Sequence, residues 1–176
     1  MATGCSLHLV HPLGFSTDER ALRRAGLDYW PRLDVTEHAS WADFVQRELC
    51  VAATHTHFQS TLALYETVCF SRACVRSPRG LRDADANSPA DARPAPWLLT
   101  THARAERHHW EASFAPGDYL LFGSETRGAA DEVHAFVGEE RRIALPMVAD
   151  ARSINLAAAV SGALFEAIRQ VERAQS

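Results

Sequence analysis

The sequence predicts a single α/β domain, residues 1–176, built on a parallel sheet. Three short apolar runs, residues 97–101, 119–122 and 143–147, each lead into a polar or glycine-containing loop. Strands of a parallel sheet are buried on both faces, so they are typically short continuous apolar runs bounded by turn signals. With 176 residues, of which 47% are hydrophobic, the chain is long enough to bury a sizeable core.

The N-terminal part predicts two further strands and a short helix. A strand over 7–10 precedes a turn, and residues 17–25 form a helix that Thr17 or Asp18 caps and Gly26 ends. A second short strand follows over 33–36.

A second helix begins after Ser40, which we expect to be its N-cap, with Asp43 at the third position as in a variant capping box. Four residues fall on one face at helical spacing and predict its apolar side. They are Trp41, Phe44, Val45 and Leu49.

Residues 71–96 differ in composition from the rest of the chain. They are rich in Arg, Ala, Asp and Pro and contain few apolar residues, so they cannot bury enough surface to fold alone. We predict a disordered insertion within the domain, preceded by an ordered flank from about residue 50 to residue 70.

The C-terminal segment predicts a long helix for which Ser153 is a good N-cap. An apolar stripe at helical spacing comprises Leu156, Val160, Leu164, Ile168 and Val171. The small residues of 157–162 allow close approach of a ligand, another helix or a partner subunit. Ordinary packing of the helix on the sheet explains them equally well.

Charge limits the classes of partner. The net charge of −4 excludes wholesale electrostatic binding of nucleic acid but permits a local basic patch. Arg20, Arg23 and Arg24 project from one side of the first predicted helix. Taken alone, these arginines are typical of a solvated helix face.

Cysteine and histidine usage argues against disulfides and metal. The four cysteines contain no CxxC pair, so we expect free thiols in a reducing compartment. His55 with His57, and His108 with His109, lack convincing ligand spacing, so we expect no metal site. No leader or membrane-spanning run is evident, so we expect no membrane partner and a cytoplasmic location, an organelle being the alternative.

The stretch GDYLLFGSETRG, residues 117–128, is the most informative motif. A buried strand runs directly into Glu125 and Arg127, which lie between Gly123 and Gly128. Ligands of α/β sheets bind beyond the carboxyl ends of the strands. The motif therefore predicts a ligand site at this turn.

Three pieces then occur in a fixed order: GDYLLFGSETRG, a strand ending in Leu-Pro-Met, and ADARSINLAAAVSGALFEAIRQ. Together with HPLGFSTDERALRRAGLDYW and WLLTT, they resemble the SPOUT-class RNA ribose methyltransferases, in particular the TrmL type. The resemblance implies a doubly wound SPOUT fold with helices on both faces of the sheet and a deep C-terminal trefoil knot. It also implies a homodimer that uses S-adenosylmethionine to methylate the 2′-hydroxyl of the wobble nucleotide, cytidine or uridine 34, of a tRNA.

Site residues carry over by motif position. The resemblance implies cofactor contacts at Leu99, Gly123, Leu145 and Ser153. It places Glu125, Ser153 and Asn155 near the reacting ribose as catalytic residues. It implies RNA contacts at Arg20, Arg23, Arg24 and Arg127, which favours an RNA-facing role for the first helix.

The family also begins with a strand and a block of the form P-x-I-x-x-N-T-G-N-I-x-R, whose Arg is assigned to activating the ribose hydroxyl. That block has no counterpart in this sequence, so relative to the family we expect an N-terminal truncation. Either the start is misassigned and the enzyme is active, or the chain is an inactive family member that acts as an RNA-binding dimer. A Rossmann-type nucleotide enzyme is disfavoured, because no G-x-G-x-x-G follows the first strand.

Overall fold

A computed structural model of the chain describes residues 3–49, 67–71 and 96–174, except residues 126, 149 and 152. Most of the predicted insertion, residues 72–95, and most of its predicted ordered flank lie outside the described residues. The strands are β1 (Ser6–Val10), β2 (Val35–His38), β3 (Thr67–Ser71), β4 (Pro96–Leu99), β5 (Arg107–His108), β6 (Tyr119–Phe122) and β7 (Arg142–Ala144). The α-helices are α1 (Glu19–Arg24), α2 (Trp41–Glu48), α3 (Asp131–Val137) and α4 (Leu156–Ala174).

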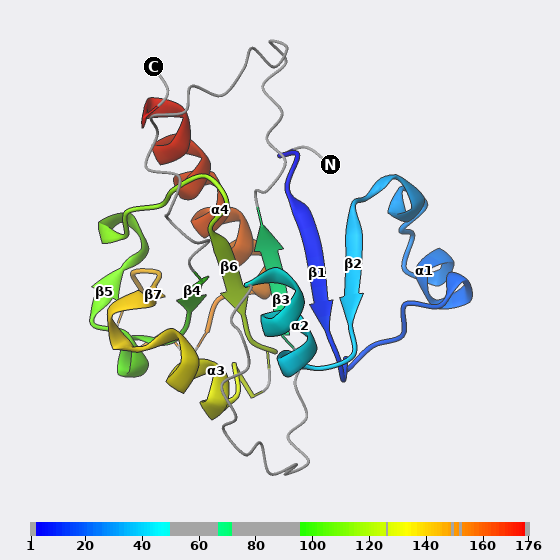
Figure 1. The fold of residues 1–176 in the computed structure, drawn as a ribbon, viewed down its shortest axis with the longest axis horizontal. Coiled ribbons are helices and arrows are strands. Elements are labelled where there is room, and N and C mark those ends of the chain that lie inside the picture. The colour runs from blue at the N-terminus through cyan, green and yellow to red at the C-terminus, as the bar shows by residue number, and fades with distance from the viewer. Residues whose placement is uncertain are drawn as a thin grey trace.

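The seven described strands form one sheet in the order β2-β1-β3-β6-β4-β7-β5 (Figure 1). All described pairings that exclude β3 are parallel, whereas β3 pairs antiparallel with both β1 and β6. The predicted parallel pairing is therefore found in four of the six strand pairs and is wrong for β3, an interior strand of the sheet. An antiparallel strand in this place satisfies the backbone groups along the facing edges of β1 and β6, which would otherwise be buried without partners.

Strand ends agree with the sequence to within a few residues. β6 spans the predicted residues, whereas β2 begins two residues later than predicted. β7 ends at Ala144 rather than Met147. Pro146 has no N–H with which to continue the ladder, so the chain leaves the sheet there.

The two predicted N-terminal helices form with the predicted caps. Asp18 caps α1 by accepting a hydrogen bond from the backbone N–H of Ala21, at 2.8 Å. Ser40 caps α2 by accepting from the N–H of Asp43, at 3.1 Å. Gly26, with φ of 71°, follows α1 in the left-handed conformation that commonly ends a helix.

Helices cover both faces of the sheet, as expected. On one face α2 and α3 bury a cluster that includes Trp41, Phe44, Leu98 and Leu121. On the other, α4 packs through Ala163 against strand residues that include Phe122 and Ile143. Neighbouring residues of β4 and β6 alternate between the two clusters, as the pleat of a strand requires.

The long C-terminal helix buries small residues as well as its predicted stripe. Ala159, Ala163 and Val171 are its buried residues. Leu156, Val160 and Leu164 are half-buried and pack against the sheet. Because an alanine occupies little space, the helix backbone can approach the sheet closely there.

A cluster of polar side chains lies beneath α2. His8 Nδ1 and His38 Nε2 lie 3.0 Å apart and form a hydrogen bond. The Glu48 carboxylate lies 3.8 Å from His38 Nε2 and accepts a hydrogen bond of 3.0 Å from the Tyr119 hydroxyl. His8, His38 and Glu48 have potential ligand atoms within 4.8 Å of one another, although the hydrogen bond between the rings accounts for their proximity. The expected absence of metal stays a prediction.

Within the described part of the chain, no helix is both long and apolar enough to cross a membrane. Cys5 is a free thiol there, as expected. The side chains of the other three cysteines lie outside the described residues.

Candidate active site

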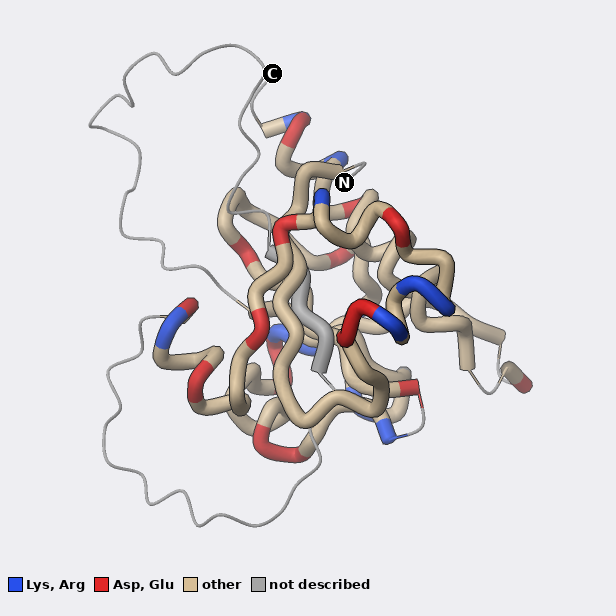
Figure 2. The backbone as a smooth tube through the Cα atoms, turned by 90° about the vertical axis from the view of Figure 1, so that its right-hand side faces the viewer, with Lys and Arg blue, Asp and Glu red and all other residues tan. Residues whose placement is uncertain are grey.

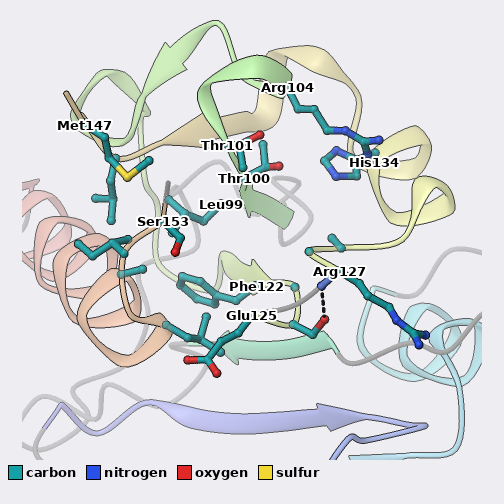
Figure 3. Close-up of a pocket in the computed structure, with 18 residues that line it drawn as sticks. Leu99, Thr100, Thr101, Arg104, Phe122, Glu125, Arg127, His134, Met147 and Ser153 are labelled. Carbon is teal, nitrogen blue, oxygen red and sulfur yellow. Dashed lines mark hydrogen bonds between the residues drawn. The ribbon is translucent and has the colours of Figure 1, made fainter. Parts of the chain in front are cut away.

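A cavity of about 420 Å³ lies at the carboxyl ends of β4, β6 and β7 (Figure 3). Three stretches supply most of the lining: residues 99–101, the turn after β6, and the segment that leads from β7 into α4. Leu99, Gly123, Leu145 and Ser153, the residues expected to contact a cofactor, all lie in this lining. The fold therefore brings together four positions that are up to 54 residues apart in sequence.

The turn after β6 closes on itself across its two glycines. Ser124 N–H donates to the Gly128 carbonyl at 3.2 Å, and Gly128 N–H donates to the Ser124 carbonyl at 2.9 Å. A Cβ on Gly123 would lie 2.0 Å from the backbone nitrogen of Ala129. Gly128 has φ of 70°, which disfavours other residues. Both glycines are thus required by the turn itself, which holds Glu125 and Arg127 at the cavity.

Glu125 and Arg127 both line the cavity, and both are exposed. Figure 3 shows the Arg127 guanidinium directed away from the other labelled side chains. Its backbone N–H donates to the Ser124 hydroxyl at 3.2 Å, which orders the turn. Arg127 therefore reaches outward, and Glu125 is the acidic residue of the described lining.

Ser153 lines the cavity, but Asn155 has a different place. The Asn155 Oδ1 accepts hydrogen bonds from the N–H groups of Ala157, at 2.9 Å, and Ala158, at 3.3 Å. These are the second and third residues of α4, so Asn155 is the N-cap, two residues after the predicted one. Asn155 is not in the cavity lining. Its catalytic role stays a prediction, and its observed role is to begin the helix.

Sequence reasoning missed Arg104 and His134, which lie together at one end of the cavity (Figure 3). Arg104 Nη1 and Asp131 Oδ1 form an ion pair of 2.9 Å. Burial, together with the positive charges of Arg104 and Arg142, lowers the pKa of His134, so its imidazole is neutral near pH 7. Neither residue stands in a motif, and a lone Arg and a lone His give no periodic or spacing signal.

The three arginines of α1 lie elsewhere. Arg20, Arg23 and Arg24 are exposed, and Arg23 pairs with Glu19 on the same helix. Figure 1 shows α1 beyond β2, at the opposite end of the sheet from β7. Figure 2, viewed from that side, shows basic and acidic segments next to each other. Of the four predicted RNA contacts, the structure brings Arg127 alone to the cavity.

Comparison with known proteins identifies similar chains. A profile of the SpoU rRNA Methylase family matches residues 86–165. The chain is 33% identical over 169 residues to a tRNA (cytidine(34)-2'-O)-methyltransferase of Saccharophagus degradans, covering 96% of this chain and 80% of that protein. It is 32% identical to the Escherichia coli K12 protein of the same name, covering 96% of this chain and 79% of that protein.

A solved structure agrees with these relatives. It is described as giving structural insights into the 2-OH methylation of C/U34 on tRNA. The TM-score is 0.58 at 34% sequence identity, and the match covers 93% of this chain and 72% of the other.

Proposed function

The chain belongs to the SpoU family of RNA methylases, and we propose that it methylates the 2′-hydroxyl of nucleotide 34 of a tRNA with S-adenosylmethionine. The single observation that carries this is the cavity. It gathers Leu99, Gly123, Leu145 and Ser153, which match the family's cofactor positions, with the carboxylate of Glu125 beside them.

The cavity suits S-adenosylmethionine in size and chemistry. Its volume of about 420 Å³ falls within the range usual for small-molecule sites. Leu99, Phe122 and Leu145 offer apolar walls suited to adenine. Glu125 supplies the negative charge that a sulfonium or ammonium group requires. We therefore propose that Leu99, Gly123, Leu145 and Ser153 bind S-adenosylmethionine.

The bound cofactor supplies an electrophilic methyl group on a sulfonium. In the proposed reaction a bond forms between the ribose O2′ and this carbon, the carbon–sulfur bond breaks, and the hydroxyl proton leaves O2′. A ribose hydroxyl is a weak nucleophile near pH 7, so a hydrogen-bond acceptor must orient it and draw off the proton. Glu125 is the acid in the described lining, and we assign it this role, with Ser153 as a second hydrogen-bonding group.

The family's knot is part of the proposal. β7 pairs with both β4 and β5, so residues 100–106, which connect those two strands, cross the end of β7. The segment after β7 then returns to line the cavity together with residues 99–101. We propose that this segment passes through the loop of residues 100–106. An experimental structure of the complex with S-adenosylhomocysteine would test this threading directly.

A homodimer formed through α4 is also part of the proposal. Phe165 on this helix is 59% exposed, and Val148 and Ile154, which precede the helix, are 77% and 48% exposed. Large exposed apolar residues close together are typical of interaction surfaces. We expect Phe165→Glu to convert a dimer into monomers in sedimentation equilibrium, and a wild type that is already monomeric would contradict this.

RNA contacts at Arg20, Arg23, Arg24 and Arg127 remain proposals, supported by their exposure. The wide separation of α1 from the cavity suits a long substrate better than a small one. The cytoplasmic location expected from the sequence likewise stays a prediction.

The test is methyl transfer from radiolabelled S-adenosylmethionine to tRNA, followed by mass-spectrometric mapping of the modified nucleotide. We expect one methyl group, at the ribose of nucleotide 34. A tRNA that already carries a 2′-O-methyl group at that position serves as the negative control. Methylation elsewhere, or cofactor binding without transfer, would reject the proposed reaction, and the latter favours an RNA-binding dimer.

Gly123→Ala tests whether the described cavity is the site. The added Cβ collides with the backbone of the turn, and we expect at least a tenfold weaker affinity for S-adenosylhomocysteine in calorimetry. Gly162→Ala is the matched control, because its Cβ would meet only Leu145 Cδ2, at an ordinary 3.5 Å. Equal affinities of the two variants would exclude this cavity as the cofactor site.

A further inference from the structure

We propose that Arg104 and His134 form an anion subsite at one end of the cavity, which binds the carboxylate of the cofactor's amino-acid part. This rests on the proposed function and adds two residues that stand in none of the motifs. Three observations carry it: the placement of both side chains in the lining, the incomplete hydrogen bonding of His134, and the distribution of charge around the cavity.

Arg104 can take a second partner. It follows β4 in a short 3₁₀ helix, and its side chain is 50% exposed. One ion pair is described for it, from Nη1 to Asp131 Oδ1, and the Asp131 side chain is 90% exposed. An ion pair so exposed to water is weak and easily exchanged. Since a guanidinium has five N–H donors, Arg104 can bind a ligand carboxylate without releasing Asp131.

His134 offers a donor beside it. Residue His134 is 6% exposed, and its buried Nδ1 has no hydrogen-bond partner among the described residues. Placing the proton on Nδ1 would bury an unpaired N–H donor, which is costly. The tautomer with the proton on Nε2 leaves an unpaired acceptor at Nδ1 in place of an unpaired donor and places the N–H on the nitrogen that can reach a ligand. That nitrogen is not among the buried unpaired atoms, and the ring lines the cavity, so the N–H is available to a ligand there.

The charges around the cavity indicate which group of the cofactor Arg104 and His134 would bind. Figure 3 shows the Arg104 guanidinium next to the His134 ring, on the opposite side of the view from Glu125. A guanidinium and an imidazole N–H together suit an anionic acceptor. The carboxylate is the anionic part of S-adenosylmethionine, whereas its sulfonium and ammonium groups are cations that Arg104 repels. The sulfonium, which is several bonds away from the carboxylate, can face Glu125 instead.

The experiment compares two ligands by calorimetry. S-adenosylhomocysteine carries the carboxylate, and 5′-methylthioadenosine lacks the whole amino-acid part. We expect Arg104→Gln to weaken S-adenosylhomocysteine about 10- to 100-fold, the usual loss for a hydrogen bond to a charged group, and to leave methylthioadenosine within twofold. Arg107→Gln, which removes an exposed arginine outside the cavity lining, is the matched control and should change neither affinity.

His134 is tested with a pair of variants. His134→Leu removes the donor, and we expect S-adenosylhomocysteine to bind about tenfold more weakly with methylthioadenosine unaffected. His134→Gln retains an N–H donor and should restore most of the lost affinity. Failure of the glutamine variant to bind better than the leucine variant would remove His134 from the subsite.

Four outcomes overturn the proposal. Equal weakening of both ligands by Arg104→Gln would mean that Arg104 only shapes the cavity. Unchanged affinity for S-adenosylhomocysteine with a raised KM for tRNA would assign Arg104 to an RNA phosphate. A wild type that binds neither ligand would reject both the proposed cofactor and the subsite. If the wild type binds both ligands and Arg104→Gln changes neither affinity, the subsite alone is rejected.

Discussion

Two regions of the molecule bury a histidine, and they differ in what surrounds it. His38, beneath α2, is fully buried, hydrogen-bonded to His8 and stacked on that ring at a centroid distance of 5.2 Å. His134, beside the cavity, has two arginines nearby and no hydrogen bond to Nδ1 among the described residues. Burial lowers the pKa of both. The Nδ1 atom of His38 likewise has no hydrogen-bond partner among the described residues, so the two rings differ in the hydrogen bond that His38 Nε2 forms with His8 and in the sign of the nearby charges, which are carboxylates at His38 and arginines at His134.

The largest expected effect on stability is at the hydrogen-bonded pair of His8 and His38. His38→Ala removes a ring that packs edge-on against Phe44 at a centroid distance of 5.2 Å and removes the hydrogen bond to His8. We expect the free energy of unfolding to fall by about 3 kcal/mol, from the cavity and the lost hydrogen bond together. Urea denaturation measures this. A change below about 1 kcal/mol would mean that the hydrogen-bonded pair does little for the fold.

Acidification should affect both regions. The folded-state pKa values of His8, His38, His109 and His134 lie below the ordinary 6.5, mainly because of burial. The unfolded chain then binds more protons, so this stability is complete above about pH 6.5 and is lost as the pH falls below it. Each such histidine contributes a slope of up to about 1.4 kcal/mol per pH unit.

We expect the unfolding free energy of wild type, measured in urea between pH 7.5 and 5, to decrease on acidification. Both His38→Ala and His134→Leu should give a shallower decrease, since each removes one group that the unfolded chain protonates more readily. Curves parallel to the wild type would show that the histidine in question titrates alike in both states.

His134→Leu should differ in sign from His38→Ala. Leucine is apolar, fits a helix and has no nitrogen to leave unpaired, so at pH 7.5 we expect stability to be unchanged or to rise by up to about 1 kcal/mol. Thermal unfolding without ligand measures this. A clear loss of stability would show that His134 has a structural partner and would remove the contrast between the two regions.

The smallest effect on stability is expected for a substitution on helix α4. Hydrogen bonds from Arg169, offset in part by burial and reinforced by Gln170, lower the pKa of Glu166 to about 2. For Glu166→Gln we expect Tm to fall by only about 1–2 °C at pH 7. The folded-state pKa is depressed, so this contribution is present above pH 4.5 and declines as the pH falls toward 2. The difference in Tm should therefore be smaller at pH 3 than at pH 7.

Local sequence signals predicted a large part of the fold and the centre of the candidate site. The apolar run of β6 and the caps Asp18 and Ser40 are local features, and each is found where expected. The positions Leu99, Gly123, Leu145 and Ser153 followed from a motif resemblance and share one cavity. Whether they bind S-adenosylmethionine stays a prediction.

Other features could not be read from local patterns. Strand β3 pairs antiparallel in the middle of the sheet, because the choice of neighbours depends on which distant edges remain to be filled. The pairing of His8 with His38 joins residues 30 positions apart, and both had passed unnoticed as single histidines. Asn155 rather than Ser153 caps α4, a shift by two residues that reflects the usual imprecision of helix ends.

What the sequence by itself determined is therefore most of the described elements, though not β3, β5 or α3, together with the caps of α1 and α2, the glycine turn and the family. Each of these depends on residues close together or on motifs in a fixed order. The tertiary structure alone decided the central place of β3, the polar pair beneath α2, and the meeting of Arg104 with His134 at the cavity. These depend on contacts between segments far apart in the chain, and such contacts are set by how the whole core packs rather than by any one segment.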